Sequence, residues 1–497
     1  MTLTLKSAVS NTVLWSVTYS VKSTARPIEM SVISGGTRIG IATLENAKIK
    51  WDLGSGRTKD FSVTPTDNDR KLTVIVNTRD NSAALLLDGA KLGEAPFRTF
   101  PTHYENPAMF RIGAAGEGSV SPVLKAMSIY DTGSEAPLQT SEGTVMETFF
   151  GDREFVLTEN GGMRATAFRY ASGVEALKIE NDRGYFIILP FQGQQIWRTC
   201  IDGRDLTMKS KFDEPRPTKE YLKTYGGFLL HCGIGAFGVP QENDSHPLHG
   251  EIPNAEYQSA YIICGDDYIA VGGHLAYDEA LNRNYTFSPE CRLYMGETFL
   301  KVNAEIENRR HTPMEYMYLC HINFRPVDGA ELVYSADCDK EHIKVFKQIA
   351  DWVPEEQKHA LRSYMEKVQD MPQLHHKIGG ASQIYDPEIC FAIKYKTDRD
   401  GRAYTLQLMD GGAWYVSHPA NILPTGIRWI ARTRDEDALG MVLPATGEHL
   451  GYENAKKRGE VKLLPPLSKV SFTIEAGYLD KEHSDSVRKK IEEIKNV

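Results

Sequence analysis

The residue types best suited to chemistry lie in two short stretches, His246-Pro247-Leu248-His249-Gly250 and Tyr318-Leu319-Cys320-His321-Ile322-Asn323-Phe324. Proline restricts φ and glycine permits left-handed conformations, so the first stretch is a shaped loop that can aim its two imidazoles. Imidazole gives or takes a proton near neutral pH, which makes acid–base chemistry the natural use of these side chains. We expect the rest of the chain to bring the two stretches together.

The second stretch alternates like a β-strand. Alternate residues of a strand share a face, so His321 and Asn323 are predicted to point one way while Cys320 and Ile322 point the other. Asn323 is therefore a candidate substrate-binding residue beside His321.

The elements that must position these residues are mainly strands. Residues 1–133 show short apolar runs separated by polar turns, which predicts an all-β sandwich. The run from Val74 to Gly93, with later strands at 110–113 and 127–130, resembles the concanavalin-like jelly rolls of the laminin-G type. Modules of that type bind sugar or protein, and this one could also carry an oligomer contact. The polar segment 131–137 marks a boundary.

Strands then continue from residue 145 to residue 480, which is too much β-structure for a small sandwich and predicts a large two-sheet architecture with few helices. One helix is expected between Pro354 and Pro372, with Leu361, Met365 and Val368 at helical spacing. Residues 481–497 form a closing helix with Val487, Ile491 and Ile494 on one stripe. The pair His375-His376 follows a helix and precedes two glycines, so we expect it to be exposed.

Four segments in this order and spacing resemble the galactose mutarotase (aldose 1-epimerase) superfamily, in particular its aldose-1-epimerase-like branch: 223–228, 246–250, 321–324 and Leu443-Pro444-Ala445-Thr446. The resemblance implies a β-supersandwich and a small-molecule or oligosaccharide sugar as partner. It further implies that His249 grips the ring and anomeric oxygens and that His321 is the acid that protonates the ring oxygen. Opening a hemiacetal ring needs a proton delivered to the ring oxygen and another taken from the anomeric hydroxyl.

The sequence departs from this pattern at the residue that would act as the base and take the proton of the anomeric hydroxyl. The resemblance places a glutamate just before Pro-Ala-Thr, where this chain has Leu443, which cannot accept a proton. Glu448 lies a few residues further on, and Glu251 shares a face with His249 if 249–251 are extended. Either carboxylate is a candidate replacement base, with a slight preference for Glu251, although a solvated rim carboxylate is the more frequent role for such a residue.

Three further residues are candidate sugar contacts, each with a plainer alternative. Arg198 could meet hydroxyl groups or be a salt-linked surface residue, and His246 could bind sugar or only its own turn. Trp414, like Trp197, could stack on a pyranose face or belong to the core. No cofactor is required for the sugar chemistry, but His246, His249 and His321 could instead hold a divalent metal, with Glu251 as fourth ligand or base.

Composition narrows the function classes. The chain has 497 residues, a net charge of −9 and no concentrated basic block, which argues against nucleic acid or an anionic membrane as partner. No apolar run approaches the roughly 18 residues of a membrane span, and no signal peptide is recognisable, so we expect a cytoplasmic protein. We therefore expect a mutarotase- or epimerase-type isomerase. A non-catalytic carbohydrate-binding protein and a metal-assisted isomerase or lyase are the alternatives.

Overall fold

The computed structural model describes residues 162–496 apart from 266, 352 and 380–384. Before residue 162 it describes residues 2–4, 12–19, 28–34, 37–45, 48–52, 58–63, 70–77, 82–87, 90–96, 109–114, 124–131, 143–145, 150 and 154–160. The predicted boundary segment after Asp131 lies outside the described residues. The chain divides into two compact units, Met1–Phe168 with Ser259–Val271, and Arg169–Gln258 with Gly272–Val497. The domain limits expected from the sequence remain predictions.

The first unit is built of antiparallel strands. One sheet has the order β1 (Thr2–Thr4), β10 (Met109–Ala114), β3 (Ile28–Ser34), β4 (Thr37–Glu45), β5 (Lys48–Asp52), β6 (Thr58–Ser62). The other has the order β11 (Leu124–Asp131), β2 (Thr12–Tyr19), β7 (Arg70–Asn77), β8 (Ser82–Leu87), β9 (Ala90–Pro96). Gly93 of β9 lies against the rings of Trp51 and Phe61, so the two sheets pack face to face. The all-β prediction is confirmed here, and the likeness to laminin-G-type jelly rolls stays a prediction.

Four more strands have all or nearly all of their residues in this unit, and β21 (Tyr268–Asp278) has residues in both units. The four pair as β12 (Gly143–Val145) with β20 (Ser259–Cys264) and β13 (Phe155–Asn160) with β14 (Met163–Arg169).

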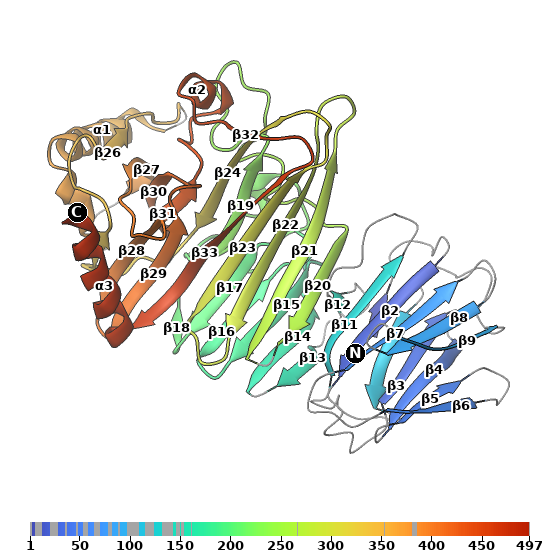
Figure 1. The fold of residues 1–497 in the computed structure, drawn as a ribbon. Coiled ribbons are helices and arrows are strands. Elements are labelled where there is room, and N and C mark those ends of the chain that lie inside the picture. The colour runs from blue at the N-terminus through green and yellow to red at the C-terminus, as the bar shows by residue number, and fades with distance from the viewer. Residues whose placement is uncertain are drawn as a thin grey trace. The chain divides into compact units, whose positions relative to one another are not determined.

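The second unit carries the candidate site and contains strands of two large antiparallel sheets (Figure 1). One sheet includes β22 (Asn284–Tyr294), β23 (Phe299–Asn308), β33 (Lys469–Asp480), β29 (Gly412–Pro419), β28 (Arg402–Met409) and β25 (Glu331–Tyr334) in that order. The other includes β15 (Glu175–Asn181), β16 (Gly184–Ile188), β17 (Ile196–Ile201), β19 (Leu229–Ile234), β24 (Met314–Ile322), β31 (Asp437–Ala445), β30 (Thr425–Arg432), β27 (Tyr385–Lys394) and β26 (Ile343–Phe346). Two short strands pair with interior strands outside that order, β18 (Arg204–Asp205) with β17 and β32 (Lys462–Leu464) with β24.

Aromatic contacts join the two sheets of this unit. Tyr318 of β24 meets Phe472 of β33 with ring centroids 4.9 Å apart, and Phe324 stacks on Trp414 of β29 at 6.1 Å. These rings belong to a core whose burial supplies the main stabilisation of such a sandwich. The predicted two-sheet architecture is therefore confirmed.

Both predicted helices are present. Helix α1 (Glu355–Asp370) buries Leu361, Met365 and Val368, as their spacing predicted. Helix α3 (Lys481–Lys495) buries Ile491 and Ile494 in a cluster with residues of β28 and β29. Short helical segments are η3 (Tyr221–Lys223), η4 (Pro372–His376) and α2 (Tyr452–Lys457). None of the described helices combines the length and apolar character that a membrane crossing requires.

The expectation that His375-His376 is exposed is wrong, because His375 is 1% exposed and His376 is half-buried. The segment η4 contacts β25, so the ring of His375 lies 3.3 Å from the hydroxyl of Tyr334 and 3.1 Å from Nη1 of Arg428. Local sequence cannot reveal this packing, because Tyr334 and Arg428 come from strands distant in the chain.

Candidate active site

His321 lies near the end of β24 and is 4% exposed. Its Nδ1 lies 2.7 Å from Oδ1 of Asn323, and Asn323 Nδ2 donates to Gly227 O at 2.9 Å. Because that second bond fixes the amide orientation, Oδ1 must accept from Nδ1–H, which assigns the neutral ring a lone pair on Nε2. Burial lowers the pKa of His321 to about 4, against the opposing effect of the Asn323 hydrogen bond. The predicted shared face of His321 and Asn323 is confirmed by their contact.

His249 is held by a loop that depends on its glycine. His249 has φ +60° and Gly250 φ +87°, both in the left-handed region. A Cβ on Gly250 would lie 2.3 Å from Ala236 O and 2.4 Å from Gly233 O, so no side chain fits there. Backbone bonds from His249 N to Gly238 O and from Gly233 N to His249 O, both 3.0 Å, fasten the loop to the end of β19.

The loop and the strand bring the two histidines into contact. The rings of His249 and His321 meet edge to face with centroids 5.3 Å apart, and Tyr221 of η3 stacks on His249 at 4.7 Å. His249 is half-buried, and its Nδ1 has no hydrogen-bond partner. Burial, followed by the neighbouring imidazoles of His321, His449 and His246, holds the pKa of His249 well below its usual value. Both rings are thus neutral near pH 7.

A third imidazole at this place was missed by sequence reasoning. His449, in the loop after β31, lowers the pKa of both His249 and His321. Its carbonyl accepts from Val239 N at 2.8 Å, next to Gly238, whose own carbonyl accepts from His249 N. The run Gly447-Glu448-His449-Leu450-Gly451 was a usable signal, because it encloses a histidine between glycines much as Gly250 follows His249.

Two aromatic side chains complete the wall around His321. The hydroxyl of Tyr225 lies 3.4 Å from both ring nitrogens of His321 and donates to Asn323 Oδ1 at 3.3 Å. Trp429 of β30 meets the His321 ring edge to face at 5.2 Å and Tyr225 at 6.0 Å. Together His249, His321, His449, Tyr221, Tyr225 and Trp429 form what we call the histidine cluster.

The two carboxylates expected as replacement bases are engaged elsewhere. Glu251 Oε1 accepts from Gly235 N at 2.9 Å and from Tyr285 hydroxyl at 2.8 Å. Glu448 is 9% exposed and forms an ion pair with Lys344 at 2.5 Å. Among the contacts of the described residues, neither carboxylate touches the ring of His249 or His321.

The position that lacks the expected glutamate is part of the core. Leu443 is 1% exposed and packs over Gly440 within β31. Thr446, three residues on, joins β31 to β24, because its N–H donates to Tyr318 O at 2.9 Å and its hydroxyl accepts from Tyr318 N at 3.1 Å. In this chain the Leu-Pro-Ala-Thr segment therefore positions the strand of His321.

His246 belongs to a different environment from His249. Its Nδ1 lies 2.8 Å from Pro247 O, and its ring borders a cavity of about 510 Å³ that Asp244, Arg283 and Tyr452 also line. Residues 247, 248, 250 and 251 border a second cavity, of about 560 Å³. The loop thus separates its two histidines, and the hydrogen bond to Pro247 matches the turn role that the sequence left open for His246.

Arg198 and Trp414 make contacts within the protein. Arg198 donates to three backbone carbonyls, those of Trp197, Gly226 and Phe212, at 2.6–2.8 Å. The bond to Gly226 holds the residue next to Tyr225, so Arg198 helps to position that member of the histidine cluster. Trp414 is 3% exposed and donates Nε1–H to Arg325 O at 2.9 Å. Trp197 is fully buried.

A carboxylate near the histidine cluster also escaped sequence reasoning. Glu388 of β27 accepts from Trp429 Nε1 at 2.5 Å, and its negative charge contributes to raising the pKa of Tyr221 and of Tyr225. Its side chain is exposed, yet desolvation by surrounding protein raises its own pKa above the usual value. No local pattern marks it, because Asp386-Pro387-Glu388 reads as an ordinary polar strand entry.

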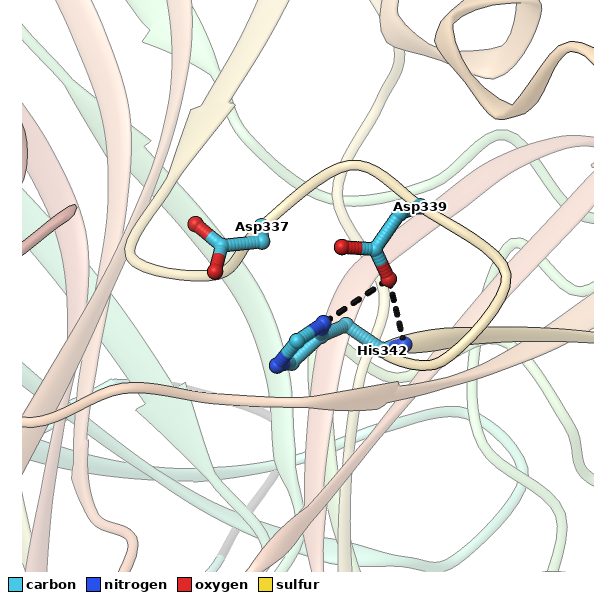
Figure 2. Close-up of side chains that lie close together, drawn as sticks. All are labelled: Asp337, Asp339 and His342. Atoms are coloured by element: carbon cyan, nitrogen blue, oxygen red, sulfur yellow. Dashed lines mark hydrogen bonds and ion pairs between the residues drawn. The ribbon is translucent and has the colours of Figure 1, made fainter.

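The geometry expected for a metal site occurs away from these histidines. In the part of the chain that is described, only Asp337, Asp339 and His342 bring three ligand atoms within 4.8 Å of one another (Figure 2). Asp339 Oδ1 already accepts from the backbone N–H of His342 and lies 2.8 Å from its Nδ1, and Asp337 pairs with Lys396 at 3.1 Å. His246, His249 and His321 do not meet that spacing, so the metal alternative has no support from their geometry.

Solved structures align with the greater part of this chain. A proposed aldose 1-epimerase from Klebsiella pneumoniae aligns over 69% of this chain and 92% of its own, with 17% identity and a TM-score of 0.59. A galactose mutarotase-like protein from Clostridium acetobutylicum aligns over 65% of this chain and all of its own, with 14% identity and a TM-score of 0.47. The first of these likenesses confirms the galactose mutarotase-like β-sandwich. No curated protein matches the sequence.

A family model described as a domain of unknown function, DUF4432, matches residues 171–477, which include every member of the histidine cluster. The chain therefore belongs to the DUF4432 family.

Proposed function

We propose that this protein is a carbohydrate-active enzyme that catalyses proton transfer at the anomeric centre of an aldose or a derivative, in mutarotation or a related epimerisation. The observation that carries the proposal is the contact of His249 and His321, whose rings lie 5.3 Å apart with Nδ1 of His321 bonded to Asn323. Two neutral imidazoles side by side, one of them half-buried, can bind and exchange protons with neighbouring sugar oxygens.

Further support comes from what surrounds the pair. Trp429 and Tyr225 offer aromatic faces and edges next to His321, and apolar sugar faces pack on such rings. The fold agrees with that of a protein described as a proposed aldose 1-epimerase, and fold by itself does not determine the reaction. The chemistry therefore has to be tested on this chain directly.

The test measures the rate of exchange between the anomers of a panel of aldoses by magnetisation-transfer NMR. We expect the wild-type protein to accelerate exchange of at least one aldose, and His321→Ala to reduce that acceleration roughly 10²–10⁴-fold, the usual contribution of a positioned acid or base. His359→Ala, on the exposed face of α1, is the matched control and should keep the wild-type rate. Equal rates for the wild type and His321→Ala would contradict the proposal.

A second candidate, a carbohydrate-binding protein without catalysis, is favoured by one observation. Leu443 is buried and apolar where the resemblance calls for a glutamate base. Saturation-transfer NMR on the same panel separates the two candidates, because binding without accelerated anomer exchange would support binding alone. Acceleration that depends on His321 would reject this second candidate.

A further inference from the structure

The strand β27 presents Glu388 to the histidine cluster. Cys390 pairs with Trp429 across β27 and β30, and Glu388 lies two residues earlier, in the irregular stretch of β27 between Tyr385 and Ile389. The hydrogen bond from Trp429 Nε1 to Glu388 Oε2 shows that the carboxylate turns toward Trp429. Residues Phe391 and Arg428, which also pair, occupy the opposite face and contact His375 there.

One indole ring connects this carboxylate to His321. Trp429 contacts the His321 ring at 5.2 Å with one part of its surface and donates to Glu388 with its ring nitrogen. Glu388 also acts electrostatically on Tyr221 and Tyr225, which stack on His249 and stand over His321 respectively. Unlike Glu251 and Glu448, it has no ion-pair partner among the described residues and remains exposed.

The hydrogen bonds of His321 fix the direction in which it can exchange a proton. Its Nδ1–H is committed to Asn323, so the ring offers a lone pair, not a proton, at Nε2. The environments of His321 and Glu388 also shift their pKa values in opposite directions. Burial lowers the pKa of His321 to about 4, and desolvation raises the pKa of Glu388. Of two such groups, the one with the raised pKa is suited to give a proton and the other to take one.

We propose that Glu388 is a catalytic residue of this site and that it donates a proton to the ring oxygen of the sugar while Nε2 of His321 accepts the proton of the anomeric hydroxyl. The C1–O1 bond becomes a carbonyl, and the electron pair of the breaking C1–O5 bond takes the proton of Glu388. The products are the open-chain aldehyde, an imidazolium and a carboxylate. Ring closure after rotation about C1–C2 returns both protons, so no cofactor is consumed.

This inference rests on the proposed function and reverses the role that the resemblance implies for His321. It also explains how the chain could dispense with a glutamate at position 443, since a carboxylate from β27 reaches the same cluster by another route.

The first experiment compares Glu388→Gln with the matched control Glu366→Gln, an exposed position in the middle of α1. Glutamine can still accept the bond from Trp429, so the fold should survive, but it cannot donate a carboxyl proton. We expect anomer exchange to fall roughly 10²–10⁴-fold in Glu388→Gln with KM little changed, and to stay at the wild-type rate in Glu366→Gln. A wild-type rate in Glu388→Gln would overturn this inference and leave the proposed function standing.

The second experiment tests the direction of transfer with the 5-thio analogue of the responsive aldose. A ring sulfur leaves as a thiolate with little need of an acid, so the defect of Glu388→Gln should shrink to about tenfold or less, whereas the defect of His321→Ala should persist. An undiminished defect of Glu388→Gln on the 5-thio sugar would show that Glu388 is the base and overturn the proposed direction. If the wild-type protein exchanges no aldose, the proposed function fails and this inference with it.

Discussion

Two polar clusters lie on opposite faces of β30, and they differ in the ionisable groups that surround them. Trp429 faces the histidine cluster, whereas Arg428 faces a group that we call the arginine cluster, made of Arg428, His375, His376 and Tyr334. Burial lowers the pKa of histidines in both, to about 4 for His321 and for His376. A lowered histidine pKa therefore does not distinguish a catalytic site from a structural one.

The ionisable group next to each cluster does distinguish them. In the arginine cluster Arg428 is fully buried, Tyr334 is 3% exposed and His376 is half-buried. The charge that acts on His375 there is the positive guanidinium. The histidine cluster includes half-buried rings and adjoins the exposed carboxylate of Glu388. A ligand can reach only a cluster that water reaches, and acid–base chemistry needs groups of opposite proton affinity.

The largest effect expected from both clusters together is a loss of stability in acid. The folded-state pKa is about 4 for His321, His449 and His376, below the ordinary value of 6.5. As pH falls from 6.5 to 4, these histidines bind protons in the unfolded chain but stay neutral in the folded chain. The free energy of unfolding therefore decreases, by up to about 1.4 kcal/mol per histidine and pH unit. Chemical denaturation at several pH values checks this.

The exposed control His359→Ala should leave that pH dependence unchanged, whereas His449→Gln and His376→Gln should each flatten it. The size of each reduction measures how much each cluster contributes to the pH dependence of the free energy of unfolding. A stability that stays constant from pH 7 to pH 4.5 would contradict the burial of these rings.

Gly250→Ala should disrupt the histidine cluster alone. The new Cβ would lie 2.3 Å and 2.4 Å from two backbone oxygens at a φ of +87°, so we expect a loss of about 3 kcal/mol or a displaced 246–252 loop with little anomer exchange. Gly203→Ala is the matched control, since its φ is +73° with no atom within 4 Å, and should cost about 1 kcal/mol. Equal losses in the two variants, measured by denaturation, would refute the close packing of Gly250.

Tyr334→Phe removes the hydroxyl that lies 2.7 Å from His376 and 3.3 Å from His375 in the arginine cluster. We expect the free energy of unfolding to fall by about 1–2 kcal/mol, because a buried hydrogen-bonding group loses its partner. Anomer exchange by the folded protein should be unchanged. A reduced exchange rate at full stability would instead assign this cluster a part in function.

Tyr225→Phe is the corresponding change in the histidine cluster and should have the smallest effect on stability. Its hydroxyl contacts Asn323 and His321 at long distances, 3.3–3.4 Å, so a change within about 0.5 kcal/mol is expected. The exchange rate should fall by about tenfold or less. If Tyr225→Phe proves the more destabilising of the two Tyr→Phe variants, the contrast between the clusters is wrong.

The residues with regular spacing were predictable from the sequence. Helices α1 and α3, the strand that carries His321 and the shared face of His321 and Asn323 follow from short-range periodicity, which reports burial of one face. The motif order likewise pointed to the galactose mutarotase-like fold, which the first structural comparison bears out. Gly250 was recognisable because only glycine adopts its backbone conformation without strain.

Other properties were decided by tertiary structure alone. Glu388, Trp429 and His449 come from β27, β30 and the loop after β31, and nothing in their local sequences relates them to His249. The same holds for the engagement of Glu251 and Glu448 by Tyr285 and Lys344. Periodicity specifies which side of an element is buried, but the partner that covers it, and hence the protonation state of a side chain, depends on strands that meet only in the folded sheet.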